Sequence, residues 1–167
     1  HGDPTEERSG TFLFITDQQT GEWWSATAEP KRARAETSST FFHEDRASFM
    51  TTVGTLRSEV DCIVLSEANG EARHITLFND GDNDRHLEIT SYGELALASE
   101  DADIAHPAFS KLFVKTEIDT EDAILFAERR RRSADEPSVA LAHFVTAANG
   151  VLSEVEAETD RRAFVGR

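Results

Sequence analysis

The chain is short of several features that define common protein classes. It has one cysteine, Cys62, so no disulfide can form within it. Its apolar residues never form the run of roughly 20 that spans a bilayer, and no secretory signal peptide is visible. Neither a disulfide scaffold nor an integral membrane protein is therefore predicted. A reducing compartment fits this composition best, with Cys62 as a buried, inert thiol.

Basic residues are also scarce. The chain has 17 Lys and Arg against 32 Asp and Glu, a formal net charge of −15. Such a field repels phosphate backbones and anionic lipid headgroups, so this segment is predicted to contact neither nucleic acid nor membrane. The one cation cluster, Arg129–Arg132, has two interpretations: a site for phosphate or an acidic partner, or a solvated strand end before the turn at Ser133–Pro137.

The sequence patterns of common catalytic and metal sites are missing as well. There is no P-loop, no G-x-G-x-x-G fingerprint and no G-x-S-x-G nucleophile elbow. His43, Glu44 and Asp45 are neighbours, and neighbours on a strand point to opposite faces, so they cannot converge on one ion. The acidic loop Asp80–Asp84 lacks the downstream glutamate of a calcium loop. We therefore predict no catalytic residue, no metal site and no cofactor.

Strand signals, in contrast, recur along the whole chain. Across Leu56–Leu65, apolar and small residues alternate with charged ones as far as Asp61, a period of two that buries one face of a strand. Asn69–Gly70 predicts a hairpin turn with positive φ, and Asn149–Gly150 predicts another. The predicted strands are Thr11–Thr16, Ala47–Val53, Leu56–Leu65, Ala72–Phe78, His86–Ala98, Leu112–Thr116, Ala123–Glu128, Val139–Thr146 and Val151–Glu158.

These closely spaced strands, with no long helices between them, predict an all-β fold of antiparallel sheets packed as a sandwich. We expect about nine or ten strands in a single domain over residues 1–167. A connecting loop is expected at Glu29–Ser39, a bulge at Gly93 and one short helical turn. Because the sequence begins at His1 and not at methionine, we expect a piece of a longer polypeptide.

One candidate contact site lies in the stretch Asp101–Glu117, which interrupts the strands. It combines polar side chains with an aromatic ring and a ring-locked proline, as a contact surface would. The candidate residues are His106, Pro107, Phe109, Ser110 and Lys111. Alternatively, Pro107 fixes a corner of the chain while Phe109 plugs the end of the sandwich.

A second candidate is the pair Trp23 and Trp24, because aromatic faces pack on sugar rings. Adjacent residues on a strand face opposite ways, so at most one of the two is available to a sugar. The alternative interpretation places one indole in the core and the other over a sheet edge.

Four long segments resemble a known family. They are RHITLFND (Arg73–Asp80), HLEITSYGELALA (His86–Ala98), AHPAFSKLFVKTE (Ala105–Glu117) and TDRRAFVGR (Thr159–Arg167), with TGEWWSATAEP near the start. The chain from Thr11 to Arg167 is similar to the N-terminal part of the phosphorylase region in cyclic β-1,2-glucan synthases. That region in turn resembles glycoside hydrolase family 94, formerly glycosyltransferase family 36.

The resemblance implies a β-supersandwich related to galactose-mutarotase-like sandwiches, truncated at its C-terminal edge. In the family, the general acid and the phosphate-binding groups lie in a later (α/α)6 barrel, so no catalytic residue is carried over. The implied partners are that helical domain of the parent chain, a second copy in a homodimer, and glucan oligosaccharide. The dimers of this family make the loop around His106 the best candidate for a contact.

The main hypothesis is a non-catalytic β-sandwich domain of a bacterial cyclic β-1,2-glucan synthase, on the cytoplasmic side of the inner membrane in the parent protein. It would supply scaffold, subunit contact and part of a glucan-binding wall. Two alternatives remain open. One is an independent carbohydrate-binding module that uses Trp23 or Trp24. The other is a mutarotase-like enzyme, which needs a general acid and a base on one concave face.

Overall fold

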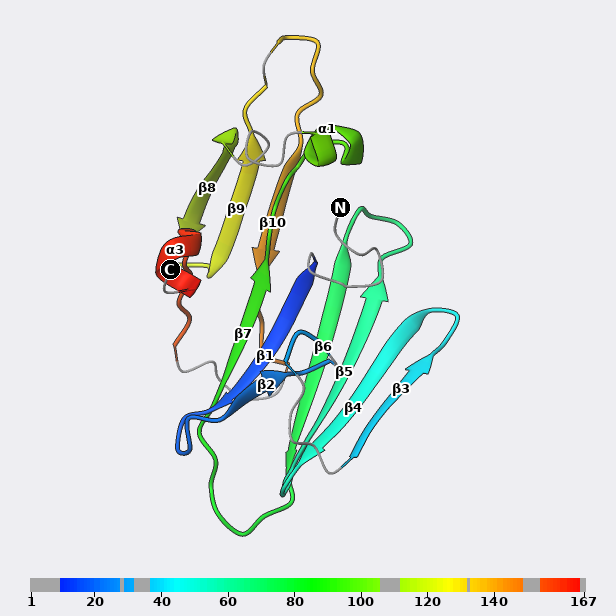
Figure 1. The fold of residues 1–167 in the computed structure, drawn as a ribbon, viewed down its shortest axis with the longest axis vertical. Coiled ribbons are helices and arrows are strands. Elements are labelled where there is room, and N and C mark those ends of the chain that lie inside the picture. Colours follow the sequence, from blue (N-terminus) through cyan, green and yellow to red (C-terminus); the bar gives the residue numbers. More distant parts are fainter. Residues whose placement is uncertain are drawn as a thin grey trace. The chain divides into compact units, whose positions relative to one another are not determined.

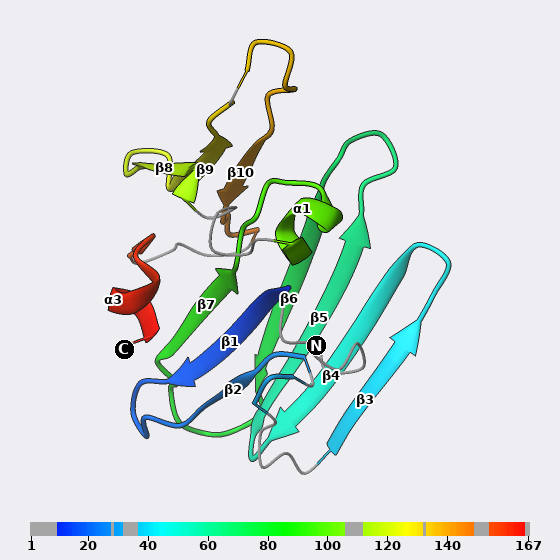
Figure 2. The ribbon, with the colours of Figure 1, turned by 45° about the horizontal axis from the view of Figure 1, so that its top comes forward.

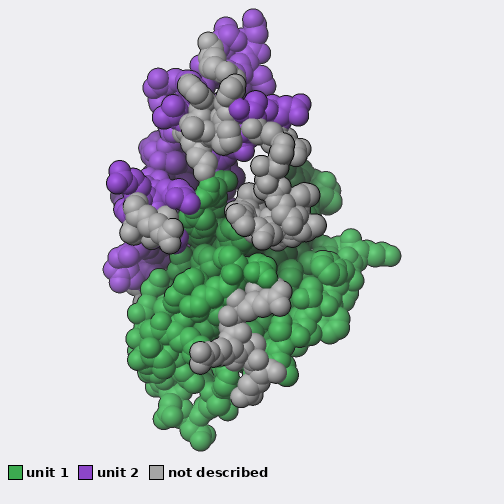
Figure 3. Space-filling model, in the orientation of Figure 1, with its two compact units in different colours: residues 1–94 green, residues 95–167 purple. Residues whose placement is uncertain are grey.

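The computed structural model describes residues 10–27, 29–31, 37–105, 112–131, 133–148 and 154–165. Ten strands lie in these ranges, and every strand pairing among them is antiparallel. The chain divides into two compact units, residues 1–94 and 95–167, coloured separately in Figure 3. The prediction of an all-β antiparallel fold is confirmed.

The first sheet of unit 1 has three strands in the order β2-β1-β7. Its strands are β1 (Thr11–Asp17), β2 (Trp23–Ser25) and β7 (Leu87–Gly93). The tight turn between β1 and β2 requires positive φ at Gly21, 72°, which glycine adopts without a steric penalty. β7 is distant in sequence, yet it pairs with β1 along its whole length, so the central strand is hydrogen-bonded on both sides.

The second sheet of unit 1 is a four-stranded meander in sequence order, as Figures 1 and 2 show. Its strands are β3 (Thr37–Phe42), β4 (Arg46–Val53), β5 (Leu56–Val64) and β6 (Glu71–Asn79). The β4–β5 turn is only two residues long and places Gly54 at φ 57°, again a conformation that favours glycine.

The core of unit 1 lies between these two sheets. Along β1, buried residues alternate with half-exposed ones, so that Leu13 and Ile15 point inward. From the other sheet, Leu56 and Val60 of β5 meet them, which confirms the predicted inner face of that strand. The buried cluster consists of Leu13, Ile15, Trp24, Ala26, Leu56 and Val60. Burial of each large side chain among these stabilises the unit by about 1.5–3 kcal/mol.

The described residues of unit 2 include a three-stranded sheet of order β10-β9-β8 and two short helices, one more than the sequence predicted. The strands are β8 (Val114–Asp119), β9 (Ile124–Arg129) and β10 (Ala140–Phe144); the helices are α1 (Glu100–Ala105) and α3 (Arg161–Val165). None of the described helices combines the length and the apolar character needed to cross a bilayer.

Two strand predictions were wrong at their C-terminal ends. The strand predicted over His86–Ala98 ends at Gly93, which pairs with the first residue of β1, and no strand among the described residues pairs with the chain beyond it. Leu97 then takes a positive φ of 49°, which a strand does not allow. Gly93 therefore terminates β7 and is not a bulge within it.

The second strand error concerns Val151–Glu158. Residues 151–153 and the turn at Asn149–Gly150 lie outside the described residues, but the described part, 154–158, is exposed and has no strand structure. The apolar face that a strand would have here consists of only Val155 and Ala157, and Val155 is 43% exposed, so little apolar area would be buried by adding this stretch to a sheet.

Three local predictions also need correction. Gly70 closes the β5–β6 hairpin as predicted, but its φ is not positive, since the connection is a longer loop closed by the Leu65 amide donating to the Gly70 carbonyl at 2.9 Å. The loop predicted over Glu29–Ser39 includes the start of β3. The stretch from Asp101 begins in helix α1, because the Ser99 carbonyl accepts bonds from the amides of Ala102 and Asp103, both at 3.1 Å.

Candidate functional site

Four aromatic rings form a row across the outer face of the β2-β1-β7 sheet. Phe12 and Phe14 occupy the β1 positions that alternate with the buried Leu13 and Ile15, so they point away from the core. In register with them are Tyr92, opposite Phe12, and Trp23, opposite Thr16 on the same face. We call Phe12, Phe14, Trp23 and Tyr92 the aromatic row.

Each ring of the aromatic row contacts the next ring along the row. Phe12 stacks on Tyr92 and on Phe14, with centroids 6.4 Å apart in both pairs. Phe14 meets Trp23 edge to face at 5.6 Å, with an interplanar angle of 85°. Both arrangements are favourable for ring quadrupoles. The row is therefore one ordered apolar strip, and Trp23 at its end is 42% exposed.

Polar groups border the aromatic row on β7. Thr90 donates to a Glu88 carboxylate oxygen at 3.1 Å, and the Tyr92 hydroxyl donates to Glu94 at 2.9 Å. Glu88 also accepts a bond from the Gln18 side chain. An apolar strip with oriented hydrogen-bonding groups beside it is the usual chemistry of a site for a polar, ring-shaped ligand.

The Lys31 ammonium lies over the Trp23 indole, 3.6 Å from the ring centroid. Two bonds with Ser25 hold the backbone of Lys31 in place: the Ser25 amide donates to the Lys31 carbonyl at 2.8 Å, and the Lys31 amide donates to Ser25 Oγ at 3.0 Å. A cation in this position is favoured by the negative face of the ring. One face of Trp23 is therefore covered unless the lysine side chain moves.

The two tryptophans have opposite environments, as alternation along β2 requires. Trp24 is 3% exposed and belongs to the core cluster, so it cannot contact a surface ligand. Its Nε1–H has no hydrogen-bond partner within the described part of the chain. Only Trp23 remains as a surface candidate. His106, Pro107, Phe109, Ser110 and Lys111 lie outside the described residues.

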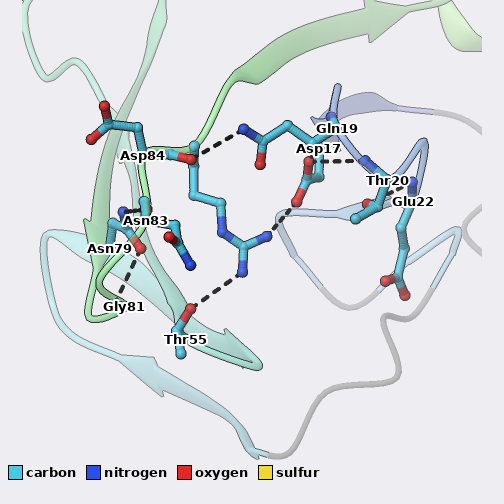
Figure 4. A network of polar contacts seen from close by, with 10 residues as sticks. Asp17, Gln19, Thr20, Glu22, Thr55, Asn79, Gly81, Asn83 and Asp84 are labelled. Atoms are coloured by element: carbon cyan, nitrogen blue, oxygen red, sulfur yellow. Dashed lines mark hydrogen bonds and ion pairs between the residues drawn. The ribbon is translucent and has the colours of Figure 1, made fainter.

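A polar network anchors the turn after β1 to the segment between β6 and β7 (Figure 4). The Asp17 carboxylate is almost fully buried and accepts bonds from the amides of Gln19 at 2.8 Å and Thr20 at 3.3 Å. Arg85 donates to the same carboxylate at 2.5 Å and, with its other nitrogen, to Thr55 Oγ1 at 3.2 Å. Gln19 reaches the Asp84 carbonyl at 3.1 Å.

The network explains the protonation state of Asp17. Burial by itself raises the pKa of this carboxyl, but the amides of Gln19 and Thr20 and the Arg85 guanidinium outweigh it, so that the pKa lies below its usual 3.8. The hollow beside Arg85 has a volume of about 450 Å³, and its lining also includes Leu56 and Leu77. Because these polar groups bond to one another, we assign the network a structural role.

The remaining titratable candidates do not assemble into a site. Cys62, predicted to be buried, is only half-buried against the core; this burial raises the pKa of its thiol, which opposes formation of the reactive thiolate. Among the residues that the structure describes, no three His, Cys, Asp or Glu side chains gather as metal ligands. Asp45 pairs instead with Arg46, at 2.9 Å.

The family of the chain follows from comparison with known proteins. The family model described as "Glycosyl hydrolase 94, supersandwich domain" matches residues 1–167. The chain belongs to this family. The antiparallel sheets described above are those of a glycosyl hydrolase 94 supersandwich domain, and the resemblance found in the sequence is confirmed.

One curated relative extends the comparison beyond the domain. This supersandwich chain is 49% identical over 165 residues to the cyclic beta-(1,2)-glucan synthase NdvB of Rhizobium meliloti (strain 1021). The match covers 99% of this chain but 6% of NdvB. The chain therefore spans only a small part of the relative that it matches.

Sequence reasoning missed three members of the aromatic row. Trp23 was a candidate, but Phe12, Phe14 and Tyr92 were not. The alternation in TFLFIT does predict that the two phenylalanines share a face. Nothing in the sequence shows that Tyr92, 80 positions after Phe12, lies opposite it across the β1–β7 pairing.

Proposed function

We propose that this chain is the supersandwich domain of a longer polypeptide of the cyclic β-1,2-glucan synthase type, and that its own role is non-catalytic. The observation that carries the proposal is the identity of 49% along nearly the whole chain, over only 6% of NdvB. A match that covers nearly all of a short chain and a small part of a long one is expected for one domain of a large enzyme. The bond-making and bond-breaking groups would then lie elsewhere in the polypeptide, in a helical (α/α)6 domain that this one supports.

The contacts of unit 1 support a scaffold role. Several of its charged side chains form ion pairs within the unit: Arg85 with Asp17, Arg57 with Glu59 and Arg73 with Glu71. A mutarotase-like enzyme needs instead an acid and a base that face a common cavity.

In the parent protein we place the domain on the cytoplasmic side of the inner membrane, where it would contact the helical domain.

Activity assays of the isolated chain and of the parent polypeptide test this proposal. The 167-residue chain is incubated with β-1,2-glucan and inorganic phosphate, and with freshly dissolved α-glucose. We expect no glucose 1-phosphate and no anomer interconversion above the buffer rate. The same phosphorolysis assay on a parent polypeptide with and without this segment should show activity only when the segment is present. Turnover of either sugar by the isolated chain would contradict the non-catalytic role.

A second function is favoured by one observation, the aromatic row. We propose that it forms part of a glucan-binding wall, with a sugar ring stacked on Trp23 and its hydroxyls bonded to Glu88 and Thr90. Trp23 is the most suitable platform because it is 42% exposed and held edge-on by Phe14. The sugar would take the place of the Lys31 ammonium on the indole face.

Titration with β-1,2-linked glucose oligosaccharides tests this wall. We expect saturable binding that changes the fluorescence of Trp23 and that weakens by about tenfold, or 1.4 kcal/mol, in Trp23→Ala. Lys31→Ala should strengthen binding by roughly two- to fivefold, because a displaced surface cation–π contact is worth about 0.5–1 kcal/mol.

Phe42→Ala is the matched control. It removes an aromatic side chain that is 81% exposed on the other sheet of unit 1, so it should leave the affinity unchanged. Equal losses in Trp23→Ala and Phe42→Ala, or no saturable binding by the unmodified chain, would rule the wall out while leaving the scaffold role intact.

A further inference from the structure

Unit 2 contains a hollow of about 480 Å³ in which most of the charged groups are cations. It is lined by Lys115, Glu128, Arg130, Arg131, Ser133 and Ala134, and we call it the cationic hollow. Three cations face one carboxylate here, in a chain whose formal net charge is −15. The local charge is therefore opposite to that of the protein as a whole.

The strand register explains why these cations gather. Lys115 of β8 lies directly opposite Glu128 of β9, so both project from the same face. The Arg130 amide donates to the Phe113 carbonyl at 2.8 Å, which extends the ladder beyond the end of β9. Arg130 therefore projects on the same side as Glu128, while Arg129 between them is buried.

The cations of the hollow differ from several arginines of the chain in that they form no ion pair with any carboxylate that the structure describes. Elsewhere in the described residues, arginines such as Arg46, Arg73 and Arg85 contact carboxylates within 4 Å. Lys115, Arg130 and Arg131 form no ion pair within the described residues, although acids outnumber bases by 32 to 17. No ion pair with a carboxylate of the described residues therefore competes with an anion for these three cations.

We propose that the cationic hollow binds a phosphate group, either as free phosphate or as the phosphate of a sugar ester. The Arg130 and Arg131 guanidinium groups offer planar pairs of donors that match phosphate oxygens. Lys115 adds a point charge and Ser133 a hydroxyl donor. All three cations line one hollow, which fits a compact anion better than an extended acidic polypeptide segment. Its volume lies in the range of small-molecule sites.

An NMR titration of the full 167-residue chain tests this site. Inorganic phosphate is the probe, and sodium chloride keeps the ionic strength constant. We expect saturable shifts at the amides around Lys115, Arg130 and Ser133. The double variant Arg130→Gln/Arg131→Gln should bind phosphate about tenfold more weakly. Glu128→Gln removes the opposing carboxylate and should bind about two- to threefold more tightly.

The matched control is Arg162→Gln, which removes one exposed cation from α3 in the same unit. It should leave phosphate affinity unchanged. Substitution of these exposed side chains does not touch a core, and the dispersion of the amide signals checks that every variant is folded. Glucose 6-phosphate in a parallel titration distinguishes the two sources, since tighter binding than phosphate assigns the site to sugar esters and weaker binding assigns it to the free ion.

Three results would overturn the proposal. Amide shifts that rise linearly with phosphate concentration and do not saturate would show general charge screening and not a binding site. An equal loss of affinity in Arg162→Gln would show a diffuse charge effect. Tighter binding of a tetraglutamate peptide than of either phosphate compound would assign the surface to an acidic polypeptide partner.

Discussion

Replacing Ile15 with alanine is expected to lower the free energy of unfolding of unit 1 by about 3–4 kcal/mol. Ile15 is 0% exposed, and it lies in the central strand of its sheet, where it packs with Trp24 from β2 and with Val60 from the facing sheet. The substitution removes three carbon atoms from a site bounded by two hydrogen-bonded sheets. The surrounding strands cannot collapse into the space without breaking their register, so the cavity persists.

Ile89→Ala is the control for this prediction. Ile89 is the cross-strand partner of Ile15 on β7 but is 37% exposed. The same side-chain deletion in the same sheet should therefore cost no more than about 1 kcal/mol. Urea unfolding followed by tryptophan fluorescence measures both, because Trp23 and Trp24 both lie in β2 and report on unit 1 alone. Equal destabilisation by the two variants would show that the core is not centred on Ile15.

Asp17→Asn is expected to lower the free energy of unfolding at neutral pH by about 2–3 kcal/mol. The carboxylate of Asp17 is buried and accepts charge-assisted bonds from Arg85 and from the amides of Gln19 and Thr20. An asparagine retains one acceptor oxygen but cannot balance the Arg85 guanidinium. The partly buried cation then loses the counter-charge that offsets its desolvation.

The effect of Asp17→Asn should depend on pH in one direction. The pKa of Asp17 is lower in the folded protein than its usual 3.8, so ionisation favours the folded state. This contribution is complete above pH 3.8, the pKa expected for the unfolded chain, and is lost as the pH falls through the lower folded pKa. The difference in unfolding free energy between the unmodified chain and Asp17→Asn should therefore shrink below pH 3.8.

Unfolding in urea at a series of pH values measures this difference. Asp45→Asn is the control, because Asp45 also pairs with an arginine, Arg46, but both side chains are exposed and the pair is screened by solvent. It should leave the unfolding free energy unchanged. A gap between Asp17→Asn and the unmodified chain that stays constant or widens in acid would refute the assigned role of the ion pair.

Much of the local architecture could be predicted from the residues. The alternation in β5 identifies its buried face, and the two adjacent tryptophans had to divide between core and surface. Period two is a local property of a strand, since successive side chains point to opposite faces wherever the strand lies. Predictions failed where a strand needed a partner: the segment after Gly93 is apolar enough for a strand, but no strand of the described ranges pairs with it.

The sequence by itself determined the all-β character of the chain, the inner faces of its best strands and its membership of the glycosyl hydrolase 94 supersandwich family. Only the tertiary structure decided which strands pair and in what register. The β1–β7 pairing brings Tyr92 to Phe12, and the β8–β9 pairing places Lys115 beside Glu128. Register between strands is set by turn lengths and by packing of the two faces, which involve residues far apart in the chain. Both candidate surfaces therefore depend on pairings that no local pattern encodes.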